Sequence, residues 1–199
     1  MIRLYIFDMG GVVSRNTDVS GRIAERLGFS VAQLHEMFHE EVVALMAGSI
    51  SSQEFWRRFS LRSDRRVDED LWALYFHPEP NPAVVKTIQE LKADARVVVG
   101  TNTIEPHYRV HSENGDYDIF HAIYASFRMG LVKPDPAFYR YILDREGCQA
   151  ERAVFIDDVE VNVEAAQKLG IHGLLFSGAR ELRRELAALR KGNGFRTDA

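Results

Sequence analysis

Short apolar runs alternate with amphipathic segments along most of the chain. The first run, Ile2 to Phe7, alternates apolar and polar side chains as a strand entering a core does. After Pro82, strand patterns alternate regularly with helical ones. Strands are predicted over residues 96–100, 122–125, 154–156 and 173–176, and helices over 83–93, near 105, 137–145, 161–169 and 179–189. This alternation implies a parallel sheet covered on both faces.

Residues 15–80 show only helical periodicity. Helices are predicted over 18–27 and 68–76, and capping boxes mark two further starts, at Ser30/Gln33 and Ser51/Glu54. Three prolines within residues 78–82 predict a turn or linker. We therefore predict an α/β fold: a Rossmann-like parallel sheet core from residues 1–14 and 81–199, with an all-helical insert over 15–80. The polar tail from Lys191 is expected to fray.

Composition narrows the class of protein. The 199 residues are 46% hydrophobic and 27% charged, as in a soluble domain, and no apolar run is long enough to span a bilayer. The N-terminus lacks a signal pattern, and the single cysteine, Cys148, excludes an internal disulfide, so a cytoplasmic setting is expected. The net charge of −4 gives no reason to expect nucleic acid or a membrane as partner. A monomer or a homodimer is expected.

Polar side chains follow three of the predicted strands. Asp8 follows the first, Thr101-Asn102 the strand over 96–100, and Asp157-Asp158 the strand over 154–156. Because the carboxyl ends of parallel strands meet at one edge of a sheet, we expect these residues to converge there. Lys133, held by Pro134 before a helix, is expected to join them.

Clustered carboxylates repel one another unless a cation joins them, and oxygen ligands of this kind suit Mg²⁺. Mg²⁺, a lysine and neutral donors can together grip a phosphoryl group, and a carboxylate can attack it to form an aspartyl-phosphate. The alternative is that each polar residue caps a helix, Asp158 and Thr103 among them. Three such strand ends with a lysine between them favour a shared site for a metal and a phosphoryl group over three separate helix caps.

Four ordered motifs resemble those of the haloacid dehalogenase superfamily, in the branch with a helical cap. They are Phe7-Asp8-Met9-Gly10-Gly11-Val12, Thr101-Asn102-Thr103, Val132-Lys133-Pro134-Asp135 and Phe155-Ile156-Asp157-Asp158. The resemblance covers nearly the whole chain. Within the superfamily the chain is most similar to sugar-phosphate phosphatases and to the phosphatase domain of soluble epoxide hydrolases. It implies an Mg²⁺-dependent phosphatase of small phosphorylated metabolites, sugar phosphates first, with residues 15–80 as the cap.

The resemblance also implies a role for each matching residue. Asp8 would be the nucleophile and a metal ligand, and Thr101, Asn102 and Lys133 would hold the phosphoryl group. The Gly10 carbonyl and Asp158 would complete the metal site, with Asp157 acting directly or through water. Asn162 would orient a metal-bound water.

One position departs from the family pattern. Most phosphatases of the superfamily carry a second aspartate two residues after the nucleophile, where this chain has Gly10. Loss of such a general acid costs about 10²–10⁴ in rate. Three interpretations stay open: a weak phosphatase or one restricted to good leaving groups, a metal-independent 2-haloacid dehalogenase, and a non-catalytic phosphate-binding protein.

Two histidine signals complete the candidates. His35-Glu36-Met37-Phe38-His39 matches the H-E-x-x-H pattern of zinc peptidases, with Glu54 as the only evident third ligand. His107 follows the second motif. It is predicted to lie on the surface of a helix turn, with a position pointing into the site as the alternative.

Overall fold

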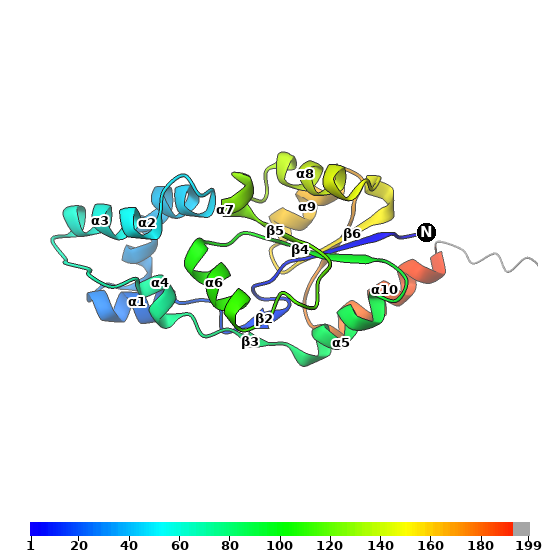
Figure 1. Cartoon of the computed structure of the whole chain (residues 1–199), viewed down its shortest axis with the longest axis horizontal. Helices are drawn as coiled ribbons and strands as arrows, with labels where there is room; N and C mark the ends of the chain where they lie inside the picture. Colours follow the sequence, from blue (N-terminus) through cyan, green and yellow to red (C-terminus); the bar gives the residue numbers. More distant parts are fainter. Residues whose placement is uncertain (193–199) are drawn as a thin grey trace, which may run out of the picture.

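A parallel sheet of five strands forms the centre of the protein, whose structure is a computed structural model that describes residues 1–192 (Figure 1). The strands are β1 (Leu4–Phe7), β4 (Arg96–Thr101), β5 (Ile123–Ala125), β6 (Ala153–Asp157) and β7 (His172–Leu175). Their order is β5-β4-β1-β6-β7, and every pairing is parallel. The predicted α/β class is confirmed. Most of the tail from Lys191 lies outside the described residues.

Helices cover both faces of this sheet (Figure 1). They are α5 (Pro82–Leu91) and α10 (Ala179–Gly192) on one face, and α8 (Pro136–Glu146) and α9 (Glu160–Lys168) on the other. Alternate side chains of β1 point to the two faces of the sheet, one covered by α5 and α10 and the other by α8 and α9. Tyr5 and Phe7 join the cluster that contains α5 and α10, whereas Leu4 and Ile6 pack against Phe138 of α8 and its neighbours. The sheet is buried on both sides because successive side chains of a strand point to opposite faces.

The helical insert forms a separate group of helices at one end of the molecule (Figure 1). Its members are α1 (Ser20–Leu27), α2 (Val31–Met46), α3 (Ser52–Ser63) and α4 (Leu71–Tyr75). Ser30 and Gln33 make both halves of the predicted capping box. Ser51 caps α3, but the Glu54 side chain binds Arg57 and Arg58 instead of completing the second box. An aromatic cluster around Phe38 fills the space between these helices.

Helix α4 begins three residues later than predicted because Asp70 is its cap. The Asp70 carboxylate accepts hydrogen bonds from the Trp72 amide and from the Ser52 and Trp56 side chains. Two short strands flank the four helices: β2 (Ser14–Arg15) precedes α1 and β3 (Glu79–Pro80) follows α4. They pair antiparallel where the chain leaves the sheet and returns to it. The proline-rich linker is therefore part of a ribbon.

Three further elements complete the described chain: α6 (Glu105–Glu113), α7 (Ser126–Met129) and the 3-10 helix η1 (Ala150–Arg152). Helix α6 packs against α4, and Ile104 before it joins the aromatic cluster of the insert. None of the helices within residues 1–192 combines the length and apolar content needed to cross a membrane.

Candidate active site at the carboxyl ends of the strands

The structure brings the predicted strand-end residues together. Strand β1 lies between β4 and β6, so Asp8, Thr101 and Asp157 leave three adjacent strands at the same edge. One carboxylate oxygen each of Asp8, Asp157 and Asp158 lies within 4.8 Å of the others. Residues separated by about 150 positions therefore share one site, as the parallel topology requires.

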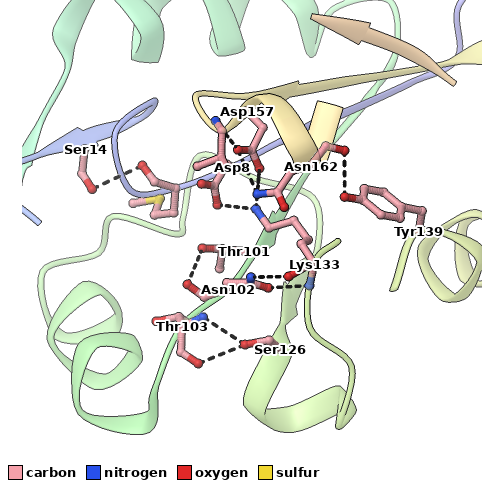
Figure 2. A network of polar contacts seen from close by, with 12 residues as sticks. Asp8, Ser14, Thr101, Asn102, Thr103, Ser126, Lys133, Tyr139, Asp157 and Asn162 are labelled. Carbon is pink, nitrogen blue, oxygen red and sulfur yellow. Dashed lines mark hydrogen bonds and ion pairs between the residues drawn. The ribbon is translucent and has the colours of Figure 1, made fainter. Parts of the chain in front are cut away.

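Lys133 lies between two of these carboxylates (Figure 2). Its Nζ atom is 2.9 Å from Oδ1 of Asp8 and 2.7 Å from Oδ2 of Asp157, and the lysine side chain is 1% exposed. Burial alone would lower the pKa of Lys133, but the two carboxylates outweigh burial and raise it above its ordinary value. The lysine is therefore a fixed cation that compensates one of the carboxylate charges.

Asp157 is fully buried, and both of its oxygens are engaged. Besides Lys133, it accepts hydrogen bonds from the Val159 amide at 2.8 Å and from Nδ2 of Asn162 at 3.2 Å to each oxygen. The Tyr139 hydroxyl in turn donates to the Asn162 carbonyl. Asn162 thus orients the Asp157 carboxylate, a contact that sequence reasoning did not anticipate.

Asp8 is poorly compensated in comparison. It is 9% exposed, and within the described residues the ion pair with Lys133 is the one polar side-chain interaction of its Oδ1. Burial raises the pKa of Asp8 to about 6; Lys133 lowers it, and the neighbouring charge of Asp157 raises it further. This carboxylate has the capacity to accept another cation or to attack an electrophile.

Asp158 lies at the mouth of the site and is exposed. Burial of part of its surface, and then the charge of Asp157, raise the pKa of Asp158. Its carboxylate packs directly over Gly11: a Cβ atom added there would lie 2.1 Å from Oδ2, and the φ of +77° favours glycine. Gly11 therefore makes room for Asp158 beside the loop of residues 8–11.

These residues fit a bound Mg²⁺. Three carboxylates converge, each offering an oxygen to one point, and Lys133 compensates one of their charges. The loop hydrogen bonds around Gly10 run from Gly11 to the Ser14 carbonyl and from Ser14 to the Met9 carbonyl. Gly10 takes no part in them, which leaves its carbonyl available as a ligand.

The Asn102 side chain contacts the main chain of Lys133. Its Oδ1 accepts from the Lys133 amide at 2.8 Å and its Nδ2 donates to the Lys133 carbonyl at 3.0 Å. The amide therefore clamps the main chain of the lysine loop (Figure 2). Thr101 is buried beside it, and its hydroxyl lies 3.5 Å from the Asn102 carbonyl.

The capping alternative is wrong for both residues considered. The N-cap of α6 is Ile104, which makes no side-chain cap hydrogen bond. The Thr103 amide donates to the Ser126 hydroxyl, which in turn donates to the Thr103 carbonyl. The amide at the start of α9 is satisfied by Asp157 rather than by Asp158.

A cavity of about 310 Å³ opens above Asp8. Its lining includes residues 8–11, Thr101 to Thr103 and Asp158. The insert side contributes Thr17 and Phe76, and α6 with its following loop contributes His107, His111 and Tyr117. No residue of the Met46–Ser52 turn lines this cavity; that turn packs on α7, where Gly48 faces the Phe127 carbonyl.

The surface position predicted for His107 is wrong. Its ring is largely buried, its Nε2 has no hydrogen-bond partner among the described residues, and burial lowers its pKa to about 3. Tyr117, whose hydroxyl is likewise buried without a partner, was missed entirely. No local pattern marks either residue, because their burial depends on how α6 packs against the insert.

The H-E-x-x-H pattern does not assemble a metal site within residues 1–192. Nε2 of His35 lies 3.3 Å from the Ser20 hydroxyl at an exposed position. Glu54 is bound by Arg57 and Arg58, whose hydrogen bonds lower its pKa to about 2. The chain thus has the H-E-x-x-H spacing of a zinc peptidase, but its side chains do not form the corresponding metal site.

The family of the chain can now be stated from its fold, its ordered motifs and its match to a known family. Residues 2–170 match the haloacid dehalogenase-like hydrolases, and the chain belongs to that family. The family resemblance drawn from the four motifs is confirmed.

Particular relatives are similar over different shares of the chain. Drimenol cyclase drtB of Aspergillus calidoustus is 36% identical over 94% of this chain, and sesquiterpene phosphatase astK of Aspergillus oryzae is 33% identical over 48% of it. The chain spans only 36% and 50% of these relatives' lengths. A haloacid dehalogenase family enzyme of Bacteroides thetaiotaomicron, crystallised with magnesium and inorganic phosphate, superimposes with a TM-score of 0.74 at 23% identity, covering 88% of this chain and 94% of that one.

Proposed function

We propose that this protein is an Mg²⁺-dependent phosphatase that hydrolyses a small phosphorylated metabolite through an aspartyl-phosphate on Asp8. The observation that carries the proposal is the buried Lys133, fixed between Asp8 and Asp157 beside the third carboxylate, Asp158. A phosphatase among the relatives, and a structural neighbour with magnesium and phosphate, support it.

The metal ligands in this proposal are Asp8, the Gly10 carbonyl and Asp158. Asp157 acts through water, because its own oxygens already accept from Lys133, Val159 and Asn162. When bound, Mg²⁺ neutralises the phosphoryl charge that accumulates during transfer. The pH-dependent charge of Asp8 makes metal binding and proton binding compete at this site.

The other residues orient the phosphoryl group. Lys133 holds a positive charge beside the Asp8 oxygen, and Thr101 supplies a hydroxyl at the end of β4. Asn102 holds the Lys133 loop through its side chain, beside the phosphoryl group that it is proposed to contact. Sugar phosphates are the first candidate substrates of this site.

The same proposal assigns residues 1–14 and 81–199 to the catalytic core and residues 15–80 to a cap. The two passages of chain between these parts run side by side in the β2–β3 ribbon. Thr17 and Phe76, which flank the four helices, line the cavity above Asp8. The cap would exclude water and select the leaving group.

Two alternatives make different predictions. A 2-haloacid dehalogenase would use Asp8 to attack carbon, and it would have no need for the exposed carboxylate of Asp158 beside the nucleophile. A non-catalytic member would bind Mg²⁺ and phosphate without turnover.

One assay separates the three functions. Phosphate release is measured with and without Mg²⁺ against sugar, nucleotide and acyl phosphates, alongside halide release from 2-haloacids. We expect Mg²⁺-dependent phosphate release that Asp8→Asn abolishes, while thermal unfolding shows that the variant is folded. Turnover that persists in Asp8→Asn, or halide release without metal, would contradict the proposal.

A further inference from the structure

The position two residues after the nucleophile offers no proton to a leaving group. Gly10 has no side chain, and a Cβ atom built there would lie 3.4 Å from Oγ1 of Thr17. Both residues line the cavity above Asp8. The space next to the reacting carboxylate is thus bordered by a neutral hydroxyl, whose pKa is far too high for general acid catalysis near pH 7.

The imidazoles of the cavity do not fill this role. His107 lies flat against Phe76, with ring centroids 3.8 Å apart, and its ring is largely buried, which disfavours the protonated form. His111 is buried, with Nδ1 2.7 Å from the carboxylate of Asp116, a residue that does not line the cavity. Burial lowers the pKa of both rings, in agreement with this packing.

The remaining ionisable lining groups are equally unsuited. Asp8 must be ionised to attack, and Asp158 lies on the metal side of Asp8, over Gly11. Tyr117 is buried at 5% exposure, and burial raises its pKa. Among the described residues, the cavity therefore has donors that can orient a substrate but no acid placed to protonate a departing alkoxide.

Resting on the phosphatase function proposed above, we infer that the substrate is a phosphoryl anhydride, either an acyl phosphate or a diphosphate, whose leaving group departs without being protonated. An ordinary alkyl phosphate, including a primary sugar phosphate, would be a poor substrate. The inference therefore replaces the sugar phosphates considered first with phosphoryl anhydrides as the favoured substrate class.

The bonds balance in this step without a general acid. An Asp8 carboxylate oxygen forms a bond to phosphorus while the bridging P–O bond breaks, and the electron pair leaves on a carboxylate or a phosphate. Water then attacks the aspartyl-phosphate, which releases inorganic phosphate and a proton and restores the Asp8 carboxylate. With an alkyl ester the same bond cleavage would release an alkoxide, at a cost of about 10²–10⁴ in rate.

The first test compares leaving groups on the wild-type chain with Mg²⁺. We expect kcat/KM for acetyl phosphate or for pyrophosphate to exceed that for glycerol 3-phosphate by at least about 100-fold. The two anhydrides tell an acyl phosphate from a diphosphate preference. Equal or faster turnover of glycerol 3-phosphate would overturn the inference. Absence of any Asp8-dependent turnover would instead overturn the phosphatase function itself.

The second test restores an acid. Gly10 does not have a left-handed φ and has room for a Cβ, so Gly10→Asp is compatible with the local backbone. Gly10→Asn is the matched control, with the same shape but no acid. We expect the ratio of glycerol 3-phosphate to acetyl phosphate turnover to rise about tenfold or more in Gly10→Asp and to stay within twofold of wild type in Gly10→Asn. An equal ratio in the two variants would contradict the missing-acid explanation.

Discussion

The imidazole of His107 lies parallel to the ring of Phe76, with centroids 3.8 Å apart and planes inclined by 8°. Phe76 follows the last helix of the insert, whereas His107 belongs to α6 on the sheet side. The stack therefore joins the two parts of the molecule at the wall of the cavity above Asp8. Because the contact excludes water from the imidazole, it also fixes the ring in its neutral form.

Removing Phe76 should return the histidine to an ordinary titration. In Phe76→Ala, water reaches His107, so its pKa rises from about 3 towards the usual value near 6.5. NMR titration of the imidazole measures this shift. Phe76→Leu is the control that keeps an apolar cover, and it should leave the pKa low. A low pKa in both variants would show that Phe76 is not the shield.

Asp8 and Asp157 should affect the stability of the Mg²⁺-free protein in opposite directions. The folded-state pKa of Asp8, about 6, is raised above 3.8, so the fold favours its protonated form. The stability that Asp8 contributes is therefore present below about pH 4 and lost as pH rises through about 6. Asp8→Asn, which is neutral throughout, should stabilise the protein at pH 7 by about 1–3 kcal/mol, with the gain vanishing near pH 4.

Asp157→Asn is the contrasting variant. Asp157 is fully buried and accepts from Lys133, Asn162 and Val159, so its loss should destabilise the protein by about 3–5 kcal/mol. Chemical denaturation at several pH values in EDTA checks both variants. Destabilisation by Asp8→Asn at pH 7 would show that its ion pair with Lys133 outweighs the cost of burying its charge.

The two neighbouring glycines should differ in their tolerance of alanine. A Cβ at Gly11 would lie 2.1 Å from the Asp158 carboxylate at a left-handed φ, whereas at Gly10 the nearest atom is 3.4 Å away. Gly11→Ala should therefore displace Asp158 and weaken Mg²⁺ binding by about tenfold or more, while Gly10→Ala has a much smaller effect. Calorimetric titration with Mg²⁺ measures both affinities. Equal affinities in the two variants would remove Asp158 from the ligand set.

Asn102 should act through the position of Lys133. Asn102→Ala removes both hydrogen bonds to the lysine main chain, and Asn102→Asp removes only the one that the amide donates. Each lost hydrogen bond removes about 1 kcal/mol of stabilisation from the Lys133 loop. We therefore expect kcat to be highest in the wild type, lower in Asn102→Asp and lowest in Asn102→Ala. Steady-state kinetics provide the comparison. A rise in KM at unchanged kcat in both variants would indicate a direct substrate contact instead.

The sequence predicted the centre of the sheet well because the strands β1, β4 and β6 are buried on both faces. The apolar run before Asp8 and the β-branched run at residues 96–100 keep their identity in any packing, and the glycines that end helices are local signals. The two-residue strands β2 and β3 could not be predicted in this way. They exist because Ser14 and Pro80 are brought together by the rest of the fold, and the prolines there indicated only a turn.

The site shows the same division. Asp8, Thr101, Asp157 and Asp158 follow from strand ends, because the topology alone makes those ends adjacent. The contacts of Asn102 and Asn162 depend on side-chain geometry that spacing does not encode. His107 depends on the stack with Phe76, a residue about 30 positions away in another part of the molecule.

The β2–β3 ribbon connects the nucleophile loop directly to the helices of the insert. Ser14, the first residue of β2, is bound through its amide to the Met9 carbonyl, next to Asp8, and it pairs with Pro80 on the returning strand. A tilt of the four helices would therefore shift the backbone next to Asp8. A bulky compound bound under those helices would displace Asp8 without touching it. Inhibitors of this protein can therefore be sought at the β2–β3 ribbon as well as in the cavity above Asp8.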